Sequence, residues 1–303
     1  MRIIGIDMTS TPTPRKPITA AVCTLRDAQL TLNTLDRLTT LDALGELLDT
    51  HSSPTLFAID APFGMPRRLL EQDGWPRSNW ADYARWIGTL DRPAFKARLE
   101  AYRNPRPPGD KQHRRRCDEL AKSKSPMMVF GVPVGLMFHE LAPRLAATNV
   151  HLPLLRETGS HVIAVEAYPA IVAQRPAGRQ PYKNDQPAKQ TKSHRNTREA
   201  MLNWIGSEAC QDVYACRVML ASAQREALLG DPTGDTLDAL LAVVQGAWSW
   251  TRRDVGFGIP AGADPLEGWI VDPMLTPAPP AIGQTKLRTP RSNRTQPTRT
   301  PTR

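Results

Sequence analysis

Short apolar runs separated by polar turns mark the first sixty residues of the chain, and they predict four β-strands. The strands are expected over residues 1–7, 18–25, 29–35 and 55–60. Before the fourth strand, over residues 41–50, leucines recur at the spacing of a helix face. Because a helix then joins the third and fourth strands, we expect the fourth strand to return beside the first by a right-handed crossover and to run parallel to it.

The pattern changes after the fourth strand. Residues 62–160 are rich in Pro, Trp and Arg and contain short helical stretches, which we interpret as a helical insertion. A fifth strand is expected over residues 161–165. Helices are then expected over about residues 195–205, 208–229 and 236–250. Together these elements predict an α/β protein: a mixed five-stranded sheet in the order 3-2-1-4-5, with strand 2 antiparallel, flanked by helices.

Composition separates a folded body from a tail. Residues 1–275 are expected to form one domain that includes the insertion. Residues 276–303 are rich in Pro, Thr and Arg and cannot bury enough apolar surface to order themselves, so we expect a disordered basic tail. The tail contributes +6 to the formal net charge of +9, and +3 remains for the body. Two body segments, 92–116 and 175–198, are also basic, and these charges favour nucleic acid as a partner.

The chain carries no signal for a membrane or for export. No run approaches the roughly 18 apolar residues of a transmembrane helix, and the amino terminus opens on a strand pattern instead of a signal peptide. The four cysteines are scattered, without a CxxC pair or a zinc-ligand spacing, and we expect reduced structural thiols. These features predict a cytoplasmic protein.

Carboxylates stand at the ends of several predicted core elements. Asp7, Asp60 and Glu166 each come directly after an apolar run, and Asp235 and Asp238 open the last helical stretch three residues apart. Carboxylates are costly to bury unless they are paired or bind cations. Oxygen ligands are those that hard divalent cations prefer. The spacing therefore suggests a divalent-metal site.

Each acid also has a simpler interpretation. Asp235 and Asp238 can belong to a capped helix start, Asp7 can end a solvated strand, and Asp60 can prepare the turn at residues 61–64. Asp238 fits the cap less well because it borders the apolar stripe of its helix. The crossover would bring Asp7 and Asp60 to one edge, where open α/β sheets bind ligands. The chain also lacks the GxxxxGK[ST], GxGxxG, GxSxG and HExxH motifs, which favours carboxylate-metal chemistry.

Several short motifs are found along most of residues 1–273. They include GIDMTS at 5–10, IDAPFGMP at 59–66, EAYP at 166–169 and GDTLDA at 234–239. With these motifs the chain resembles the domain-of-unknown-function family 429, a group regarded as predicted nucleases with an RNase H-like fold. Two positions depart from many relatives: Ala170 stands where they carry a second acid, and Met8 where they carry Gly after the first-strand acid.

The resemblance implies a reaction and a site. Within the wider RNase H-like group, Holliday-junction resolvases carry an acid on strand one, an acid on strand four and two acids three apart on the last core helix. Asp7, Asp60, Asp235 and Asp238 match those roles in order, and Glu166 would be a flanking acid. The expectation is a metal-dependent nuclease that uses Mg²⁺ or Mn²⁺, held by these five acids, with the four aspartates as catalytic residues.

Substrate contacts are expected from the basic segments, which could equally be ordinary solvated surface. The candidates are Arg116, Tyr182, Lys183, Lys189 and Lys192. Three other classes of protein stay open. The first is a nucleic-acid-binding protein that keeps the fold without turnover, the second is a phosphotransferase of the sugar-kinase and actin type, and the third is a structural or regulatory protein.

Overall fold

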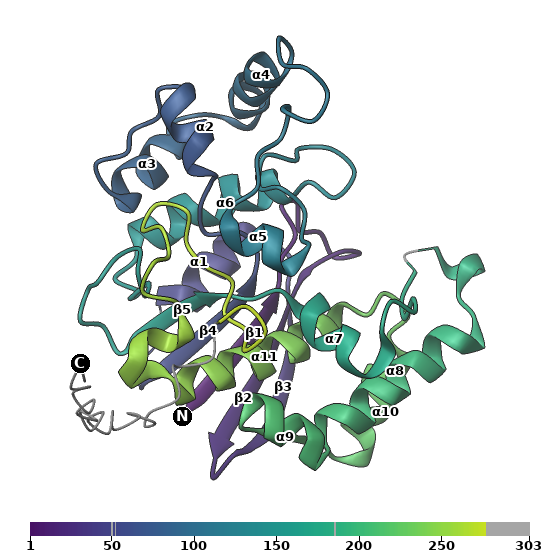
Figure 1. Cartoon of the computed structure of the whole chain (residues 1–303). Coiled ribbons are helices and arrows are strands. Elements are labelled where there is room, and N and C mark those ends of the chain that lie inside the picture. Colours follow the sequence, from purple (N-terminus) through teal and green to yellow (C-terminus); the bar gives the residue numbers. More distant parts are fainter. Residues whose placement is uncertain (50, 52, 185, 277–303) are drawn as a thin grey trace, which may run out of the picture.

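The computed structural model describes the 303-residue chain except residues 50, 52, 185 and 277–303. Within the described residues, six strands form one mixed sheet in the order β5-β4-β1-β2-β3-β6 (Figure 1). The strands are β1 (Arg2–Asp7), β2 (Ile18–Arg26), β3 (Gln29–Leu38), β4 (Thr55–Asp60), β5 (Val162–Glu166) and β6 (Arg217–Met219). Strands β1, β4 and β5 are parallel, whereas β2 is antiparallel to both β1 and β3.

The expected order of five strands agrees with this sheet, but the expected number of strands is wrong. Strand β6 pairs in parallel with β3 and extends that edge. It interrupts the helix that was expected over residues 208–229. Ala215 takes a positive φ of 56° and ends helix α9 (Glu208–Tyr214), and helix α10 (Ser222–Gly230) begins only after β6. The predicted disordered tail lies outside the described residues, apart from Thr276.

Helix α11 (Asp235–Thr251) lies along one face of the sheet at close range. A Cβ atom at Gly5 of β1 would come within 2.0 Å of the Ala239 carbonyl oxygen, and one at Gly246 of α11 within 2.8 Å of the Ala58 Cβ atom. Glycine at these two positions therefore permits the contact between helix and strands. Helix α7 (Pro169–Ala177) packs beside α11, followed by α8 (Lys192–Ile205) and by α9 and α10.

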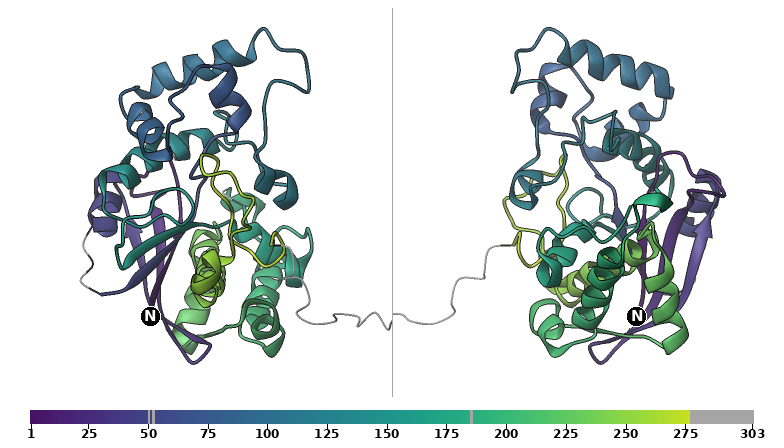
Figure 2. Two further views of the ribbon diagram at one scale, coloured as in Figure 1. Left: turned by 60° about the vertical axis from the view of Figure 1, so that its left-hand side comes forward. Right: turned by 90° about the vertical axis from the view of Figure 1, so that its right-hand side faces the viewer.

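The other face of the sheet is covered by α1 and by the long insertion between β4 and β5. The helices are α1 (Leu41–Asp49), α2 (Arg67–Gln72), α3 (Trp80–Ile87), α4 (Arg92–Arg103), α5 (Arg116–Ala121) and α6 (Val134–Ala147). Of these, α2, α3 and α4 lie together beyond the end of the sheet (Figures 1 and 2). Trp80 and Phe138 of the insertion share one buried cluster with Ile4 and Ile59 of the strands. The insertion thus extends the core of the sheet.

The chain finally crosses back over the end of β5. Two short 3₁₀ helices lie earlier in the chain: η1 (Pro187–Lys189) comes before α8, and η2 (Arg253–Gly258) follows α11. Asp272 is fully buried there and accepts hydrogen bonds from Tyr214 Oη at 2.9 Å and Gln245 Nε2 at 2.7 Å. This buried carboxylate is separate from the carboxylates at the ends of β1 and β4. Its hydrogen bonds attach the C-terminal segment to α9 and α11.

Two further expectations concern membranes and cysteines. No helix within the described ranges is long and apolar enough to cross a membrane. All four cysteines are buried and none forms a disulfide. Burial raises the pKa of the Cys23 and Cys210 thiols to about 12. These cysteines are therefore structural side chains of the core.

Candidate functional site

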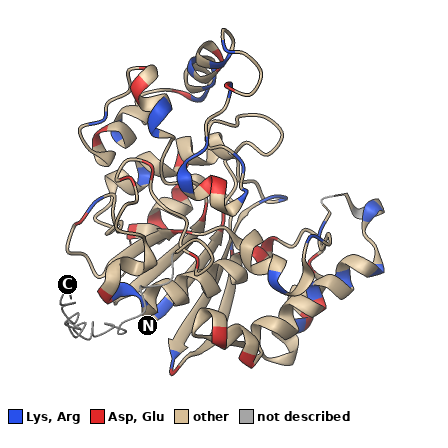
Figure 3. Cartoon of the chain, viewed as in Figure 1, with Lys and Arg blue, Asp and Glu red and all other residues tan. Residues whose placement is uncertain are grey.

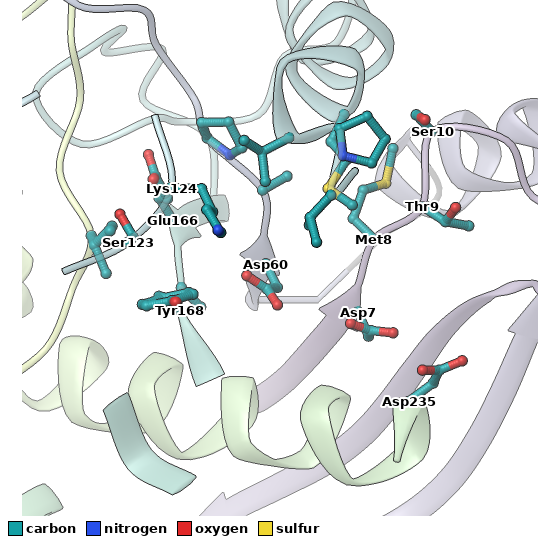
Figure 4. A pocket seen from close by; sticks show the side chains of 18 of the residues that line it. Asp7, Met8, Thr9, Ser10, Asp60, Ser123, Lys124, Glu166, Tyr168 and Asp235 are labelled. Atoms are coloured by element: carbon teal, nitrogen blue, oxygen red, sulfur yellow. The ribbon is translucent and has the colours of Figure 1, made fainter. Parts of the chain in front are cut away.

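The site begins with two strand ends that are in register. Strands β1 and β4 run parallel, and their last residues, Asp7 and Asp60, are direct neighbours. Side chains alternate between the two faces of a strand, so residues an even number of positions apart share a face. Ile3, four residues before Asp7, and Ala58, two residues before Asp60, lie in the core next to α11. Both acids therefore project on the face that carries α11. Figure 4 shows Asp60, Asp7 and Asp235 in a row above that helix.

The first turn of α11 carries two acids, Asp235 of this row and Asp238. The helix starts after Gly234, whose φ is 74°, and Asp235 makes no side-chain capping hydrogen bond. Asp231 fills the capping role instead, because its carboxylate accepts the backbone N–H groups of Thr233 and Thr236, each at 3.0 Å. The simple interpretation of Asp235 as a cap is thus wrong. Asp238, one turn later, is 3 % exposed and faces the strand ends.

The four aspartates repel one another. Burial raises the pKa of Asp7 well above its ordinary value, and the charges of Asp238, Asp60 and Asp235 raise it further. Burial, followed by the charge of Asp238, raises the pKa of Asp60 to about 8. A cation at this edge would relieve both effects.

Lys183 and Tyr182 supply the counter-charge and the hydrogen bond that Asp238 receives. Lys183 Nζ forms an ion pair with Asp238 Oδ2, and Tyr182 Oη donates to Asp238 Oδ1 at 2.5 Å. Arg198 holds this segment in place, since its guanidinium donates to the Tyr182 carbonyl at 2.6 Å. Burial alone would lower the pKa of Lys183, but the carboxylates of Asp238 and Asp7 outweigh it and raise that pKa. Lys183 is therefore a charged partner of the aspartates.

Glu166 lies at the same edge but on the opposite face. It is the register neighbour of Ile59, one residue before Asp60, so its side chain points away from α11. Both of its oxygens accept hydrogen bonds from Arg115, at 2.6 and 2.8 Å, and one also accepts the Phe63 backbone N–H at 2.9 Å. Glu166 thereby fixes the turn that follows Asp60. These contacts do not favour the metal-ligand role that was expected of it.

Arg115 is the principal residue that the sequence pattern did not single out. It is 1 % exposed, and all five of its guanidinium N–H groups are used, by Glu166, Asp118 and the Glu267 carbonyl. Its neighbour Arg116, the expected substrate contact, has a side chain that is 68 % exposed and pairs with Glu119. The distinction between adjacent arginines depends on tertiary packing.

A cavity of about 490 Å³ lies over the aspartates. Its floor includes Asp7, Asp60 and Asp235, and its walls come from the loop after β1, the insertion segment 123–137 and Tyr168 (Figure 4). Among the expected substrate-binding residues, Lys183 lines it, whereas Arg116, Tyr182, Lys189 and Lys192 do not. Lys124, which was not predicted, also lines it and forms no hydrogen bond or ion pair with any other described residue.

Basic residues are spread over several separate elements of the fold. Figure 3 shows Lys and Arg on α4, before α5 and on α8, with acids near the strand ends between them. Residues 92–116 and 175–198, the two basic segments of the sequence, thus belong to separate parts of the molecule. Of the second segment, Lys183 is the residue whose charge reaches the aspartates.

The donor set of this edge suits Mg²⁺ or Mn²⁺, because it consists of carboxylate oxygens whose raised pKa values show that a nearby positive charge would favour their ionised form. The carboxylate oxygens are not arranged around a common point where an ion could bind. Within the described part of the chain, no three His, Cys, Asp or Glu side chains are arranged so that they could hold a metal ion. Asp238 has both oxygens engaged by Tyr182 and Lys183. An ion that used Asp238 would have to displace Lys183.

The stability of the protein without divalent metal is expected to fall as the pH rises. The pKa of Asp60 is about 8 in the folded protein and near the ordinary 3.8 in the unfolded chain. Between these values the folded chain holds a proton that the unfolded chain has released, so the free energy of unfolding decreases with pH. Thermal unfolding between about pH 5 and pH 8 measures this effect. The Asp60→Asn variant should show a smaller decrease, and an equal decrease in both proteins would contradict the assignment.

Comparison with known proteins identifies a family to which the chain is similar. A family model described as "Protein of unknown function (DUF429)" matches residues 5–257. The match includes the strands and the helix that carry the four aspartates. No curated protein and no solved structure matches the chain.

Proposed function

The chain belongs to the DUF429 family, whose function is unknown, and we propose that it is a metal-dependent phosphodiesterase that hydrolyses nucleic acid. The observation that carries this proposal is the alignment of Asp7 with Asp60 on parallel strands, facing Asp235 and Asp238 of α11. The proposal includes an RNase H-like fold. An antiparallel second strand, a parallel fourth strand and an acid pair on the helix beneath them support it.

The aspartates have the central roles. The charges of the other three aspartates all act on Asp7, and we assign it as the central residue of the set that would hold the metal, together with Asp60, Asp235 and Asp238. Bound Mg²⁺ or Mn²⁺ would supply an activated water and neutralise charge on the phosphate. In the hydrolysis a water oxygen forms a bond to phosphorus and one phosphorus–ester oxygen bond breaks. The water loses one proton, and the departing oxygen takes one up.

Cationic side chains of the pocket complete the site. Lys183 and Lys124 are both within the cavity and are placed to attract the phosphodiester. Preorganised charges of this kind are usually the largest contribution to catalysis. Arg115 acts through Glu166, which holds the backbone N–H of Phe63 and so positions the turn after Asp60. We assign Arg115 and Glu166 as positioning residues.

Cleavage assays test the proposal. Labelled single-stranded, duplex and branched DNA and RNA are incubated with the protein in Mg²⁺ or Mn²⁺, with chelator as the blank. We expect metal-dependent cleavage of at least one substrate. Failure to cleave any of them, or cleavage that persists in chelator, would contradict the proposal.

Lys183→Met should tighten metal binding. Lys183 competes with a metal ion for Asp238, and its removal leaves that carboxylate open to the ion. We expect Mn²⁺ to bind about fivefold more tightly, measured by calorimetry, because a partly exposed ion pair contributes up to about 1 kcal/mol. Lys189→Met is the matched control, since Lys189 is exposed and outside the cavity. Weaker Mn²⁺ binding in Lys183→Met would show that the lysine supports the site and does not compete for it.

One observation favours a second candidate, a nucleic-acid-binding protein without turnover. Lys183 already neutralises Asp238, and the described acids form no ready metal-binding group. This candidate predicts salt-sensitive binding that is indifferent to divalent metal. Binding curves at several salt concentrations, with Mg²⁺ and with chelator, separate the two functions.

A further inference from the structure

Three of the aspartates, Asp7, Asp60 and Asp235, line a cavity of about 490 Å³ and are themselves partly buried. Segments from the loop after β1 and from the insertion bound the same cavity. Cavities of about 300 to 1,000 Å³ enclose small ligands, a range that suits a single nucleotide. Both strands of a duplex do not fit within a cavity of this volume, so a paired nucleotide would have to leave its partner strand before it could enter.

Hydrogen bonds hold both walls of this pocket in shape. Arg92 of α4 donates to the Ser10 carbonyl at 3.0 Å, to Ser10 Oγ at 2.9 Å and to Thr11 Oγ1 at 2.8 Å, which ties the loop after β1 to the insertion. On the insertion side, the Gly135 N–H donates to the Met128 carbonyl at 2.8 Å. The loop after β1 is thus held against α4, and residues 128–135 of the insertion are held to each other.

The chemistry of the walls suits a nucleotide with its base unpaired. Lys124 has no partner among the described residues and lines the pocket, where it can bind a phosphate. Val132 also lines it and is 54 % exposed. Two residues earlier, Phe130 is 51 % exposed, with the Arg103 guanidinium 4.9 Å from its ring centroid. Phe130 itself does not line the cavity but adjoins Gly131 and Val132, which do. Exposed aromatic side chains near cationic residues bind unstacked bases.

From these features we infer that the site takes the unpaired end of a nucleic-acid strand and excludes the interior of a duplex. The terminal nucleotide enters the pocket, its phosphate contacts Lys124, and the adjoining base stacks at Phe130. This inference rests on the proposed function, since it names the substrate of the same aspartate site. It makes Lys124 and Phe130 specificity-determining residues.

Fluorescence anisotropy measures binding without turnover and tests the inference. The protein is first stripped of metal with a chelator, and binding is then measured in Ca²⁺. The probes are a linear single strand, a covalently closed single-stranded circle of the same sequence and a blunt duplex. We expect the linear strand to bind at least about tenfold more tightly than the circle or the duplex. Phe130→Ala and Lys124→Met should each weaken linear-strand binding about fivefold or more. Val255→Ala is the control, because Val255 is 67 % exposed and lies beyond the far end of α11.

The outcomes separate this inference from the proposed function. Equal binding of linear strand and circle, or tight duplex binding, overturns end recognition, whereas metal-dependent cleavage in the same preparation would still support the phosphodiesterase. Preferential binding of linear strands that Phe130→Ala and Lys124→Met weaken supports end recognition even if no substrate is cleaved, and in that case the hydrolytic function is wrong. Unchanged binding in both variants overturns the assigned contacts.

Discussion

The Asp7→Asn variant is expected to lose metal-dependent hydrolysis by at least about a hundredfold, more than the effect of removing a residue that only supports a ligand. Asp7 is the acid whose electrostatic neighbours include all three other aspartates, so its carboxylate would be central to the set that holds the metal. Asparagine has nearly the same shape but no charge. Initial rates on a labelled substrate in Mg²⁺, together with Mn²⁺ calorimetry, measure the loss.

The fold of this variant should be intact. Burial and neighbouring charges raise the pKa of Asp7, so a neutral side chain is favoured in the metal-free protein. Asp27→Asn is the matched control. Asp27 lies in the turn after β2, at the other end of the sheet, with a φ of 47° that asparagine tolerates. Asp7→Asn with undiminished hydrolysis, or a similar loss in Asp27→Asn, would contradict the assigned role.

Arg115→Met is expected to destabilise the protein by about 3–5 kcal/mol, the range for breaking a buried ion pair. Arg115 and its two acidic partners, Asp118 and Glu166, have side chains between 1 and 3 % exposed. Without the guanidinium, two carboxylates stay buried without a counter-charge. Denaturant unfolding followed by tryptophan fluorescence measures the change.

Arg116→Met provides the control for this prediction. The two arginines are adjacent, but the Arg116 side chain is exposed and its ion pair with Glu119 is solvated. Such pairs contribute about 0 to 1 kcal/mol, so the free energy of unfolding should hardly change. Equal destabilisation of both variants would show that the buried network does not account for the loss.

The sequence was informative where strand pattern and connectivity determine position. The apolar runs before Asp7 and Asp60, with one helix between the third and fourth strands, were enough to place both acids at the same edge. The order of five strands followed from the same argument. Strand β6 was missed because it has three residues and pairs in a stretch whose spacing suits a helix.

The remaining features depend on register and on distant contacts. Glu166 ends a strand at the predicted edge, but its face is set by the pairing of β5 with β4, which no local pattern reveals. The pairing of Lys183 with Asp238 joins residues 55 positions apart. Arg115 lies in an irregular segment before α5, where no hydrophobic period separates it from the exposed Arg116.

A crystal structure of the protein with Mn²⁺, located by its anomalous scattering, tests the central claim most directly. If the aspartates hold the metal, we expect a Mn²⁺ ion in contact with the carboxylates of Asp7 and Asp60, and Lys183 Nζ moved away from Asp238. Absence of anomalous density at this edge at saturating Mn²⁺, with Lys183 still paired with Asp238, would contradict it.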